Sequence, residues 1–200
     1  MKEKEEERLK NLKKYEVLLA SNSPRRRQLL SDLGIQFTPY VINGIDETYP
    51  AGTPVMEIAE TISRQKAEAY KKIINGNHLV ITADTVVIAN GEVLGKPKDA
   101  SDAANMLCRL SGKLHHVVTG VTITTATRQS SFSAVTEVEF APLSDEEIRY
   151  YIDNFSPLDK AGAYGIQEWI GYIGVRSING SFYNVMGLPL QRLYTELKTY

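Results

Sequence analysis

Residues 15–34 read YEVLLASNSPRRRQLLSDLG, and this stretch predicts the class of fold. Val17–Ala20 is a short apolar run typical of a buried strand, and the turn-forming residues 21–24 stop it. Arg25–Leu33 suits a helix, which Gly34 ends. A strand, a tight turn and a helix follow one another here, as they do in proteins that build a sheet with helices on its faces.

The turn between this strand and this helix is a candidate anion site. We expect Ser23 to cap the helix and Pro24 to occupy its first position. The free N–H groups of a helix N-terminus attract anions, and the guanidinium groups of Arg25 and Arg26 would project toward the same anion. Phosphate binding is one interpretation, and a capped surface helix with solvated arginines is the other.

Strands and helices alternate along the rest of the chain. Strands are expected over residues 37–41, 78–88, 92–94, 116–125 and 132–140, and helices over 54–74, 99–110, 144–154 and 188–197. Residues 116–140 form a long hairpin in this interpretation. The sequence therefore predicts an α/β fold with a mixed β-sheet and helices on its faces.

Length and charge fit one domain and exclude several functions. The 200 residues are enough to bury a core, and we place a single domain at 15–200 after a charged N-terminal extension at 1–14, which only Leu9 and Leu12 could anchor. With 23 Lys and Arg against 24 Asp and Glu, the formal net charge is −1, which argues against a nucleic-acid binder. The sequence has no membrane span and no apolar signal-peptide region.

The single cysteine indicates the cellular compartment in which we expect the protein. Cys108 cannot form an intramolecular disulfide, which suits a reducing environment, and we expect a cytoplasmic protein. From its spacing to Leu107 and Leu110, Cys108 is expected in the core of its helix.

Two further segments carry candidate chemistry. Asp84 stands where we expect an apolar strand to reach its carboxyl end, and a carboxylate there could bind Mg²⁺ or take a proton from water, although such an Asp more often serves a turn. Lys96 follows Gly95 in a segment that resembles a phosphate-binding P-loop only superficially, because the glycine spacing is one residue short and Pro97 replaces the Ser or Thr. Lys96 is either a phosphate contact or a solvated lysine.

These motifs together resemble the Maf family of nucleoside triphosphate pyrophosphatases, from Val17 to the C-terminus. The matching segments, in order, are SNSPRRRQLLSDLGI (21–35), GIDETYP (44–50), ISRQKA (62–67), ITADTVV (81–87), LGKPKD (94–99), SGKLHHVVTGV (111–121), DKAGAYGIQ (159–167) and NVMGLPL (184–190). The resemblance implies an elongated mixed β-sheet flanked by helices, with two lobes and a central cleft for the substrate. It also implies a homodimer.

The resemblance further implies a reaction and its residues. Members of the family cleave nucleoside triphosphates between the α- and β-phosphates with Mg²⁺ or Mn²⁺. Asp84 would be the catalytic base that activates water, and Glu47 and Asp84 would lie at the metal. The polar and cationic lining of the phosphate path would comprise Ser21, Arg25, Arg26, Lys66 and Lys96.

The segment that ends at Gln167 resembles the subgroup that acts on dTTP and UTP, whose selectivity positions match Arg25, Thr85 and Gln167. The Gln167 amide can accept a hydrogen bond from pyrimidine N3–H and donate one to O4, whereas cytosine presents the reversed pattern. After Gln167 the chain departs from the usual small residue of the family, with Glu168 and Trp169.

Two other functions stay open. One is a nucleotide-binding regulator of septum formation or cell-division arrest, a role also associated with the family. The other is a pyrophosphatase that acts on purine or noncanonical nucleotides, against which Gln167 is the main evidence.

Overall fold

The long strand β3 (His78–Ala89) is the axis of the fold in the computed structural model, which describes residues 9–200. It belongs to a seven-stranded sheet in the order β2-β1-β3-β5-β6-β7, with β4 also paired to β3. The other strands are β1 (Glu16–Leu19), β2 (Thr38–Pro39), β4 (Glu92–Leu94), β5 (Leu114–Thr124), β6 (Gln129–Phe140) and β7 (Val175–Asn179). Because β2, β1 and β3 run parallel and the remaining pairs antiparallel, the predicted mixed sheet is confirmed.

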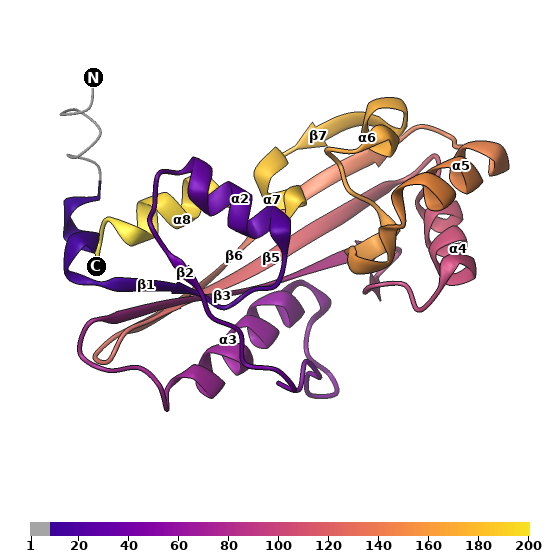
Figure 1. The fold of residues 1–200 in the computed structure, drawn as a ribbon. Helices are drawn as coiled ribbons and strands as arrows, with labels where there is room; N and C mark the ends of the chain where they lie inside the picture. Colours follow the sequence, from indigo (N-terminus) through magenta and orange to yellow (C-terminus); the bar gives the residue numbers. More distant parts are fainter. Residues whose placement is uncertain (1–8) are drawn as a thin grey trace, which may run out of the picture.

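Helices cover both faces of this elongated sheet (Figure 1). They are α2 (Pro24–Asp32), α3 (Ile58–Tyr70), α4 (Ala100–Leu110), α5 (Asp145–Phe155), α6 (Trp169–Gly174), α7 (Phe182–Met186) and α8 (Leu190–Leu197), with short 3-10 helices η1 (Lys10–Lys14), η2 (Val55–Glu57), η3 (Pro157–Asp159) and η4 (Ala161–Ala163). Helix α3 lies on one face, α2, α7 and α8 lie on the other, and α4 to α6 gather at one end (Figure 1). Within residues 9–200, no helix combines the length and apolar character needed to cross a membrane.

Successive residues of β3 point to different cores, because side chains alternate along a strand. Leu79 and Ile81 pack with α2 and α8. Further along the same face, Val87 packs in a second core with α4 and α5. Val86 points the other way and packs with α3. The two separate cores on one face account for the two predicted lobes.

The predicted Ser23 cap of α2 is confirmed, and a second cap starts α5. The Ser23 hydroxyl accepts a hydrogen bond from the Arg26 N–H at 3.4 Å, and Pro24 is the first residue of α2. Ser144 and Glu147 form the reciprocal capping box at the start of α5. These caps start both helices where the sequence predicts them.

Helix α3 approaches the sheet very closely at Gly120 of β5. A Cβ atom on Gly120 would lie 2.3 Å from the Glu60 backbone nitrogen and 2.4 Å from the Ala59 carbonyl carbon. Only glycine leaves room for this contact. The glycine thereby sets the position of α3 and of the residues that α3 carries.

Some elements differ from the predictions. The strand expected at 37–41 is reduced to Thr38–Pro39, and the helix expected over 54–74 is the 3-10 turn η2 followed by α3, which ends at Tyr70. The N–H groups of Ile73 and Ile74 both turn back to the Tyr70 carbonyl and close the helix. The buried Tyr70 side chain also bonds the chain at residues 40–42, which fixes the place where the helix ends.

The prediction for Cys108 was wrong, because this side chain is exposed. On α4 the buried face consists of Ala103, Met106, Leu107 and Leu110. Adjacent helical residues differ by about 100° in direction, so the residue after Leu107 turns toward solvent.

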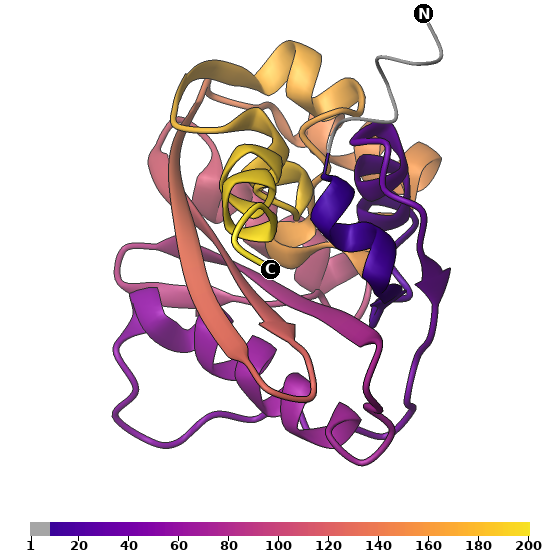
Figure 2. The same ribbon diagram turned by 90° about the vertical axis from the view of Figure 1, so that its left-hand side faces the viewer.

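Residues 10–14 pack on the C-terminal helix, and the two ends of the described chain lie close together (Figure 2). Leu12 is buried in the first core. The Asn11 amide donates to the Leu197 carbonyl at 2.7 Å, and the Lys14 ammonium donates to the Tyr200 carbonyl at 2.7 Å. Residues 1–8 of the predicted extension lie outside the described residues, and a domain boundary at residue 15 stays a prediction.

Candidate active site

A gap along one edge of β3 creates the site. Strand β1 pairs with this edge only as far as Ile81, and β4 pairs with it only from Val87 onward. Strand β5 covers the opposite edge throughout. Between Thr82 and Val86 the open edge therefore accepts side chains from helices and loops in place of a strand.

Asp84 lies in the middle of this gap. The expectation that it stands at the carboxyl end of its own strand was wrong, since β3 continues to Ala89. The strand that ends beside Asp84 is the parallel neighbour β1, at Leu19. Asp84 thus still lies in the crevice beyond a parallel strand, where ligands gather in α/β sheets.

A pocket of about 410 Å³ lies over the gap, a volume typical of small-molecule sites. All the predicted site residues line it: Ser21 from the loop after β1, Arg25 and Arg26 from α2, Glu47 from the loop before η2, Lys66 from α3, Asp84 and Thr85 from β3, Lys96 from the loop after β4, and Gln167 from the loop before α6. The structure therefore brings together residues that are far apart in the sequence.

Lys66 joins two carboxylates of the pocket, Glu47 and Asp84. Its ammonium lies 2.7 Å from Asp84 Oδ1 and 3.0 Å from Glu47 Oε1. Asp84 and Lys66 are mostly buried, with side chains 14% and 13% exposed, whereas the Glu47 side chain is 53% exposed. Two acids from different segments thus converge on one positive charge.

The same two acids fit a divalent metal. No three His, Cys, Asp or Glu side chains of residues 9–200 are grouped closely enough to hold a metal ion by themselves. Mg²⁺ does not need such a group, because it takes one or two carboxylates together with phosphate oxygens and water. Glu47 and Asp84, whose oxygens converge on the Lys66 ammonium, are the residues that would hold such an ion.

Arg26 is held by three acceptors from two segments, the strand β3 and the turn after α7. Its Nε donates to the Gly187 carbonyl at 2.8 Å, its Nη1 to the Ala83 carbonyl at 3.0 Å, and its Nη2 to Thr85 Oγ1 at 2.9 Å. Burial lowers the pKa of Arg26, and the nearby Asp84 charge opposes this change. Arg26 therefore ties α2 to the open edge of β3 and to the turn after α7.

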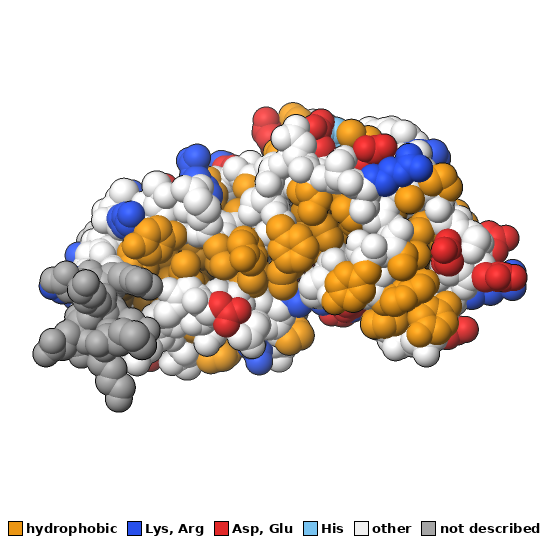
Figure 3. Space-filling model, turned by 90° about the horizontal axis from the view of Figure 1, so that it is seen from above, with side chains coloured by type: hydrophobic (Ala, Val, Ile, Leu, Met, Phe, Trp, Pro, Cys, Tyr) orange, Lys and Arg blue, Asp and Glu red, His pale blue; other side chains and the backbone are white. Residues whose placement is uncertain are grey.

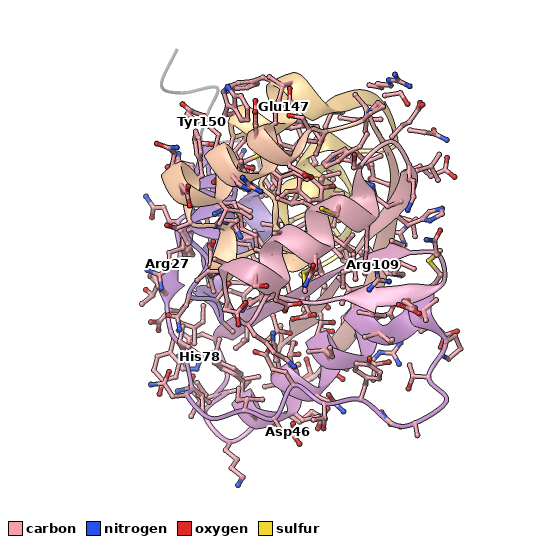
Figure 4. All side chains as sticks on the ribbon, turned by 90° about the vertical axis from the view of Figure 1, so that its right-hand side faces the viewer. Arg27, Asp46, His78, Arg109, Glu147 and Tyr150 are labelled. Atoms are coloured by element: carbon pink, nitrogen blue, oxygen red, sulfur yellow. The ribbon has the colours of Figure 1, made fainter. Side chains whose placement is uncertain are left out.

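The neighbouring arginines differ from Arg26. Arg25 reaches across the pocket, with its Nη1 2.8 Å from Asp159 Oδ2. Burial alone would raise the pKa of Asp159, but hydrogen bonds from Lys160 and Arg25 outweigh it and lower that pKa. Arg27 donates instead to the Ser21 carbonyl at 3.2 Å and lies at the outer edge of the molecule (Figure 4).

Two predicted residues lie at the pocket with polar groups available to a ligand. Lys96 is exposed, and it forms no ion pair with any residue of the described part of the chain. The side-chain oxygen of Gln167 is buried, and among residues 9–200 it has no hydrogen-bond partner. A buried acceptor left unpaired costs about 1–3 kcal/mol, so this oxygen points to a ligand that donates an N–H or O–H group.

The sequence analysis missed two residues that shape the pocket, Lys160 and Gly187. Lys160 is buried although it is charged, and Gly187 adopts φ 111°, which favours glycine, while its carbonyl holds Arg26. Both lie in segments that carry the family resemblance, DKAGAYGIQ and NVMGLPL. The helix before Gly187, α7, was not predicted from the sequence, so no local signal marked this glycine.

Comparison with known proteins identifies relatives over nearly the whole chain. The family model described as Maf-like protein matches residues 16–200. A dTTP/UTP pyrophosphatase from Bacteroides thetaiotaomicron is 58% identical over 190 residues, which cover 95% of this chain and 98% of the relative. A dTTP/UTP pyrophosphatase from Phocaeicola vulgatus is 60% identical with the same coverage. One from Porphyromonas gingivalis is 53% identical over 194 residues, or 96% of this chain and 98% of the relative.

Proposed function

The chain belongs to the Maf-like protein family, and from this membership we propose that it is a dTTP/UTP pyrophosphatase. The reaction joins water to the substrate, breaks the bond between the α- and β-phosphates, and yields a nucleoside monophosphate and pyrophosphate. Close relatives that bear this name support the proposal. The observation that carries it is the unpaired Gln167 oxygen in the same pocket as Asp84 and its surrounding cations. Neither this pocket nor the relatives named above favour the division-regulator alternative.

We propose that Asp84 takes the proton from the attacking water. Lys66 holds the Asp84 carboxylate in place through their 2.7 Å ion pair. Arg25 and Lys96, together with Ser21 near the N-terminus of α2, are placed to bind the triphosphate oxygens. Glu47 and Asp84 would hold a divalent metal, whose chemistry when bound is to offset phosphate charge.

In this proposal Arg26 mainly maintains the shape of the site. Most of its five N–H donors already bind protein acceptors, so it sets the distance between α2 and the open edge of β3. Its positive charge still lies along the phosphate path. Arg25 is different, because a triphosphate would compete with Asp159 for its guanidinium group.

The first prediction concerns substrate choice. We expect the highest kcat/KM with dTTP and UTP, because Gln167 Oε1 needs the N–H donor that both bases present at N3. CTP, ATP and GTP are expected to react about tenfold more slowly or worse. For CTP and ATP the reason is that the base presents a bare ring nitrogen where Gln167 Oε1 needs an N–H, which leaves a polar group of the site unpaired. Pyrophosphate release from a panel of the five nucleotides checks this. Equal rates for all five would exclude the proposed selectivity.

The second prediction concerns the metal. Removing divalent ions with EDTA is expected to abolish turnover, and Mg²⁺ or Mn²⁺ is expected to restore it, because triphosphate charge must be offset in the pocket. The Glu47→Gln variant is expected to need a higher metal concentration for half-maximal rate, since it loses one of the two carboxylates. Full activity in EDTA would contradict the proposed metal requirement.

We also propose a cytoplasmic homodimer. Supporting its association, hydrophobic side chains gather over much of the face seen in Figure 3. Phe182 and Tyr183 of α7 are 39% and 50% exposed, and Tyr172 of α6 is 77% exposed. Apolar patches of this kind favour protein contacts. Light scattering is expected to give about twice the chain mass of 22.3 kDa, and a monomer at all concentrations would contradict the proposal.

A further inference from the structure

The turn that carries Gln167 is held by a carboxylate that the proposed reaction does not use. The Glu168 N–H donates to the Gly165 carbonyl at 2.9 Å, which closes a turn with Gln167 inside it. The Gly165 N–H donates to the Tyr151 hydroxyl at 3.0 Å, and that hydroxyl donates to Glu168 Oε2. Glu168 is thus bound, through Tyr151, to the start of its own turn.

The second oxygen of Glu168 faces a buried cation. Lys160 Nζ lies 3.2 Å from Glu168 Oε1 and 2.7 Å from Asp159 Oδ1. Asp159 in turn pairs with Arg25. Because a buried charge needs a partner, the buried Lys160 ammonium pairs with both carboxylates, and the network extends through Asp159 and Arg25 to the phosphate path.

Gly165 shows how close Glu168 and Gln167 are. A Cβ atom on Gly165 would lie 2.8 Å from the Glu168 carboxyl carbon and 3.1 Å from Gln167 Nε2. The Glu168 carboxylate and the NH₂ end of the Gln167 amide thus both lie beside Gly165, and the Gln167 oxygen is a buried atom without a hydrogen-bond partner among residues 9–200. The negative charge favours this orientation, because rotating the amide by half a turn would bring its oxygen toward the carboxylate.

The orientation of this amide decides which pyrimidine it can pair with. In the observed orientation the free oxygen accepts from the N3–H of uracil or thymine. After half a turn the NH₂ group would take its place and donate to the bare N3 of cytosine. A glutamine free to rotate would match both bases and discriminate poorly.

We propose that Glu168 is a positioning residue that sets uracil-over-cytosine selectivity by orienting the Gln167 amide. This inference rests on the proposed function. It gives a role to the position at which the sequence departs from the small residue usual in the family.

The test compares kcat/KM for UTP and CTP in the wild-type chain and in Glu168→Gln, which keeps the size of the side chain and an acceptor for Tyr151 but removes the charge. The UTP-to-CTP ratio is expected to fall about tenfold, partly through a rise in CTP turnover. The same fall is expected for Glu168→Ala. If the alanine variant fails to fold, the UTP-to-CTP ratio of the glutamine variant alone tests the proposal.

The matched control is Glu146→Gln, on the exposed surface of α5, which is expected to keep the wild-type ratio. A wild-type ratio in Glu168→Gln, with or without an equal loss on both nucleotides, would overturn the inference and leave Glu168 a purely structural role. A wild-type enzyme that does not prefer UTP to CTP would instead overturn the proposed function. The two failures are therefore distinguishable.

Discussion

Asp84→Asn is expected to slow UTP hydrolysis by at least ~100-fold, the scale for loss of a general base. The substitution keeps the size of the side chain and an oxygen that can still accept from Lys66, but it removes the charge and the capacity to take a proton from water. A further loss is expected if the carboxylate also holds the metal. Pyrophosphate release at saturating UTP measures the effect.

Binding is expected to respond differently from turnover in this variant. Arg25, Lys66 and Lys96 still line the pocket, and one negative charge fewer reduces repulsion of the triphosphate. UTP affinity measured without metal is therefore expected to stay the same or to improve slightly. This contrast separates an enzyme from a binding regulator, which has no reaction to lose. Near-native pyrophosphate release in Asp84→Asn would show that Asp84 is not the base and would direct attention to Glu47.

Arg26→Ala is expected to have the second largest effect, with turnover reduced by about 100-fold or more and a lower melting temperature. The substitution leaves the Gly187 and Ala83 carbonyls and the Thr85 hydroxyl without the donor that joins them. An unpaired buried acceptor costs about 1–3 kcal/mol, so the pocket is expected to rearrange and lose the alignment that hydrolysis needs. Thermal unfolding and UTP turnover measure the two effects.

Arg27→Ala is the matched control, one residue further along the same helix. Arg27 does not line the pocket, and its side chain lies at the outer edge of the molecule (Figure 4). Its turnover is expected to stay within about twofold of wild type, as for surface substitutions in general. A larger loss for Arg27→Ala than for Arg26→Ala would contradict the assignment of these two side chains.

Local patterns predicted the elements well. The Ser23 cap and the strand expected over residues 78–88 depend on residues near one another in the chain, and both are confirmed. The predicted hairpin is also confirmed, with Leu114 opposite Glu139 at its far end. The prediction that Cys108 is buried was wrong because neighbouring residues of a helix point in different directions, so that Leu107 faces the core and Cys108 faces solvent.

The gap in the sheet could not be predicted, because it depends on strand pairing between distant segments. It exists because β1 stops at Leu19 while β4 begins its pairing at Val87, and neither limit is visible from the residues around Asp84. The role of Arg26 is similar. The sequence predicts a cation at a helix N-terminus. Its hydrogen bond to the carbonyl of Gly187, which is far away in the chain, could be found only in the three-dimensional structure.

Local patterns already indicated Arg25, Arg26, Asp84 and Lys96, the motif resemblance supplied the other site residues, and the structure adds how they are related. It places Lys66 between Asp84 and Glu47, and it leaves one atom of Gln167 unpaired. It also joins Glu168 to the turn that carries Gln167, which no spacing in the sequence indicated.

The most direct test of the account is the identity of the products that the purified chain forms from UTP with Mg²⁺. Separation of the products by chromatography, with phosphorus NMR of the same mixture, distinguishes the two bonds that water could break. UMP and pyrophosphate are expected in equal amounts, because water breaks the bond between the α- and β-phosphates. UDP and orthophosphate as the products, or no product while UTP binds tightly, would contradict it.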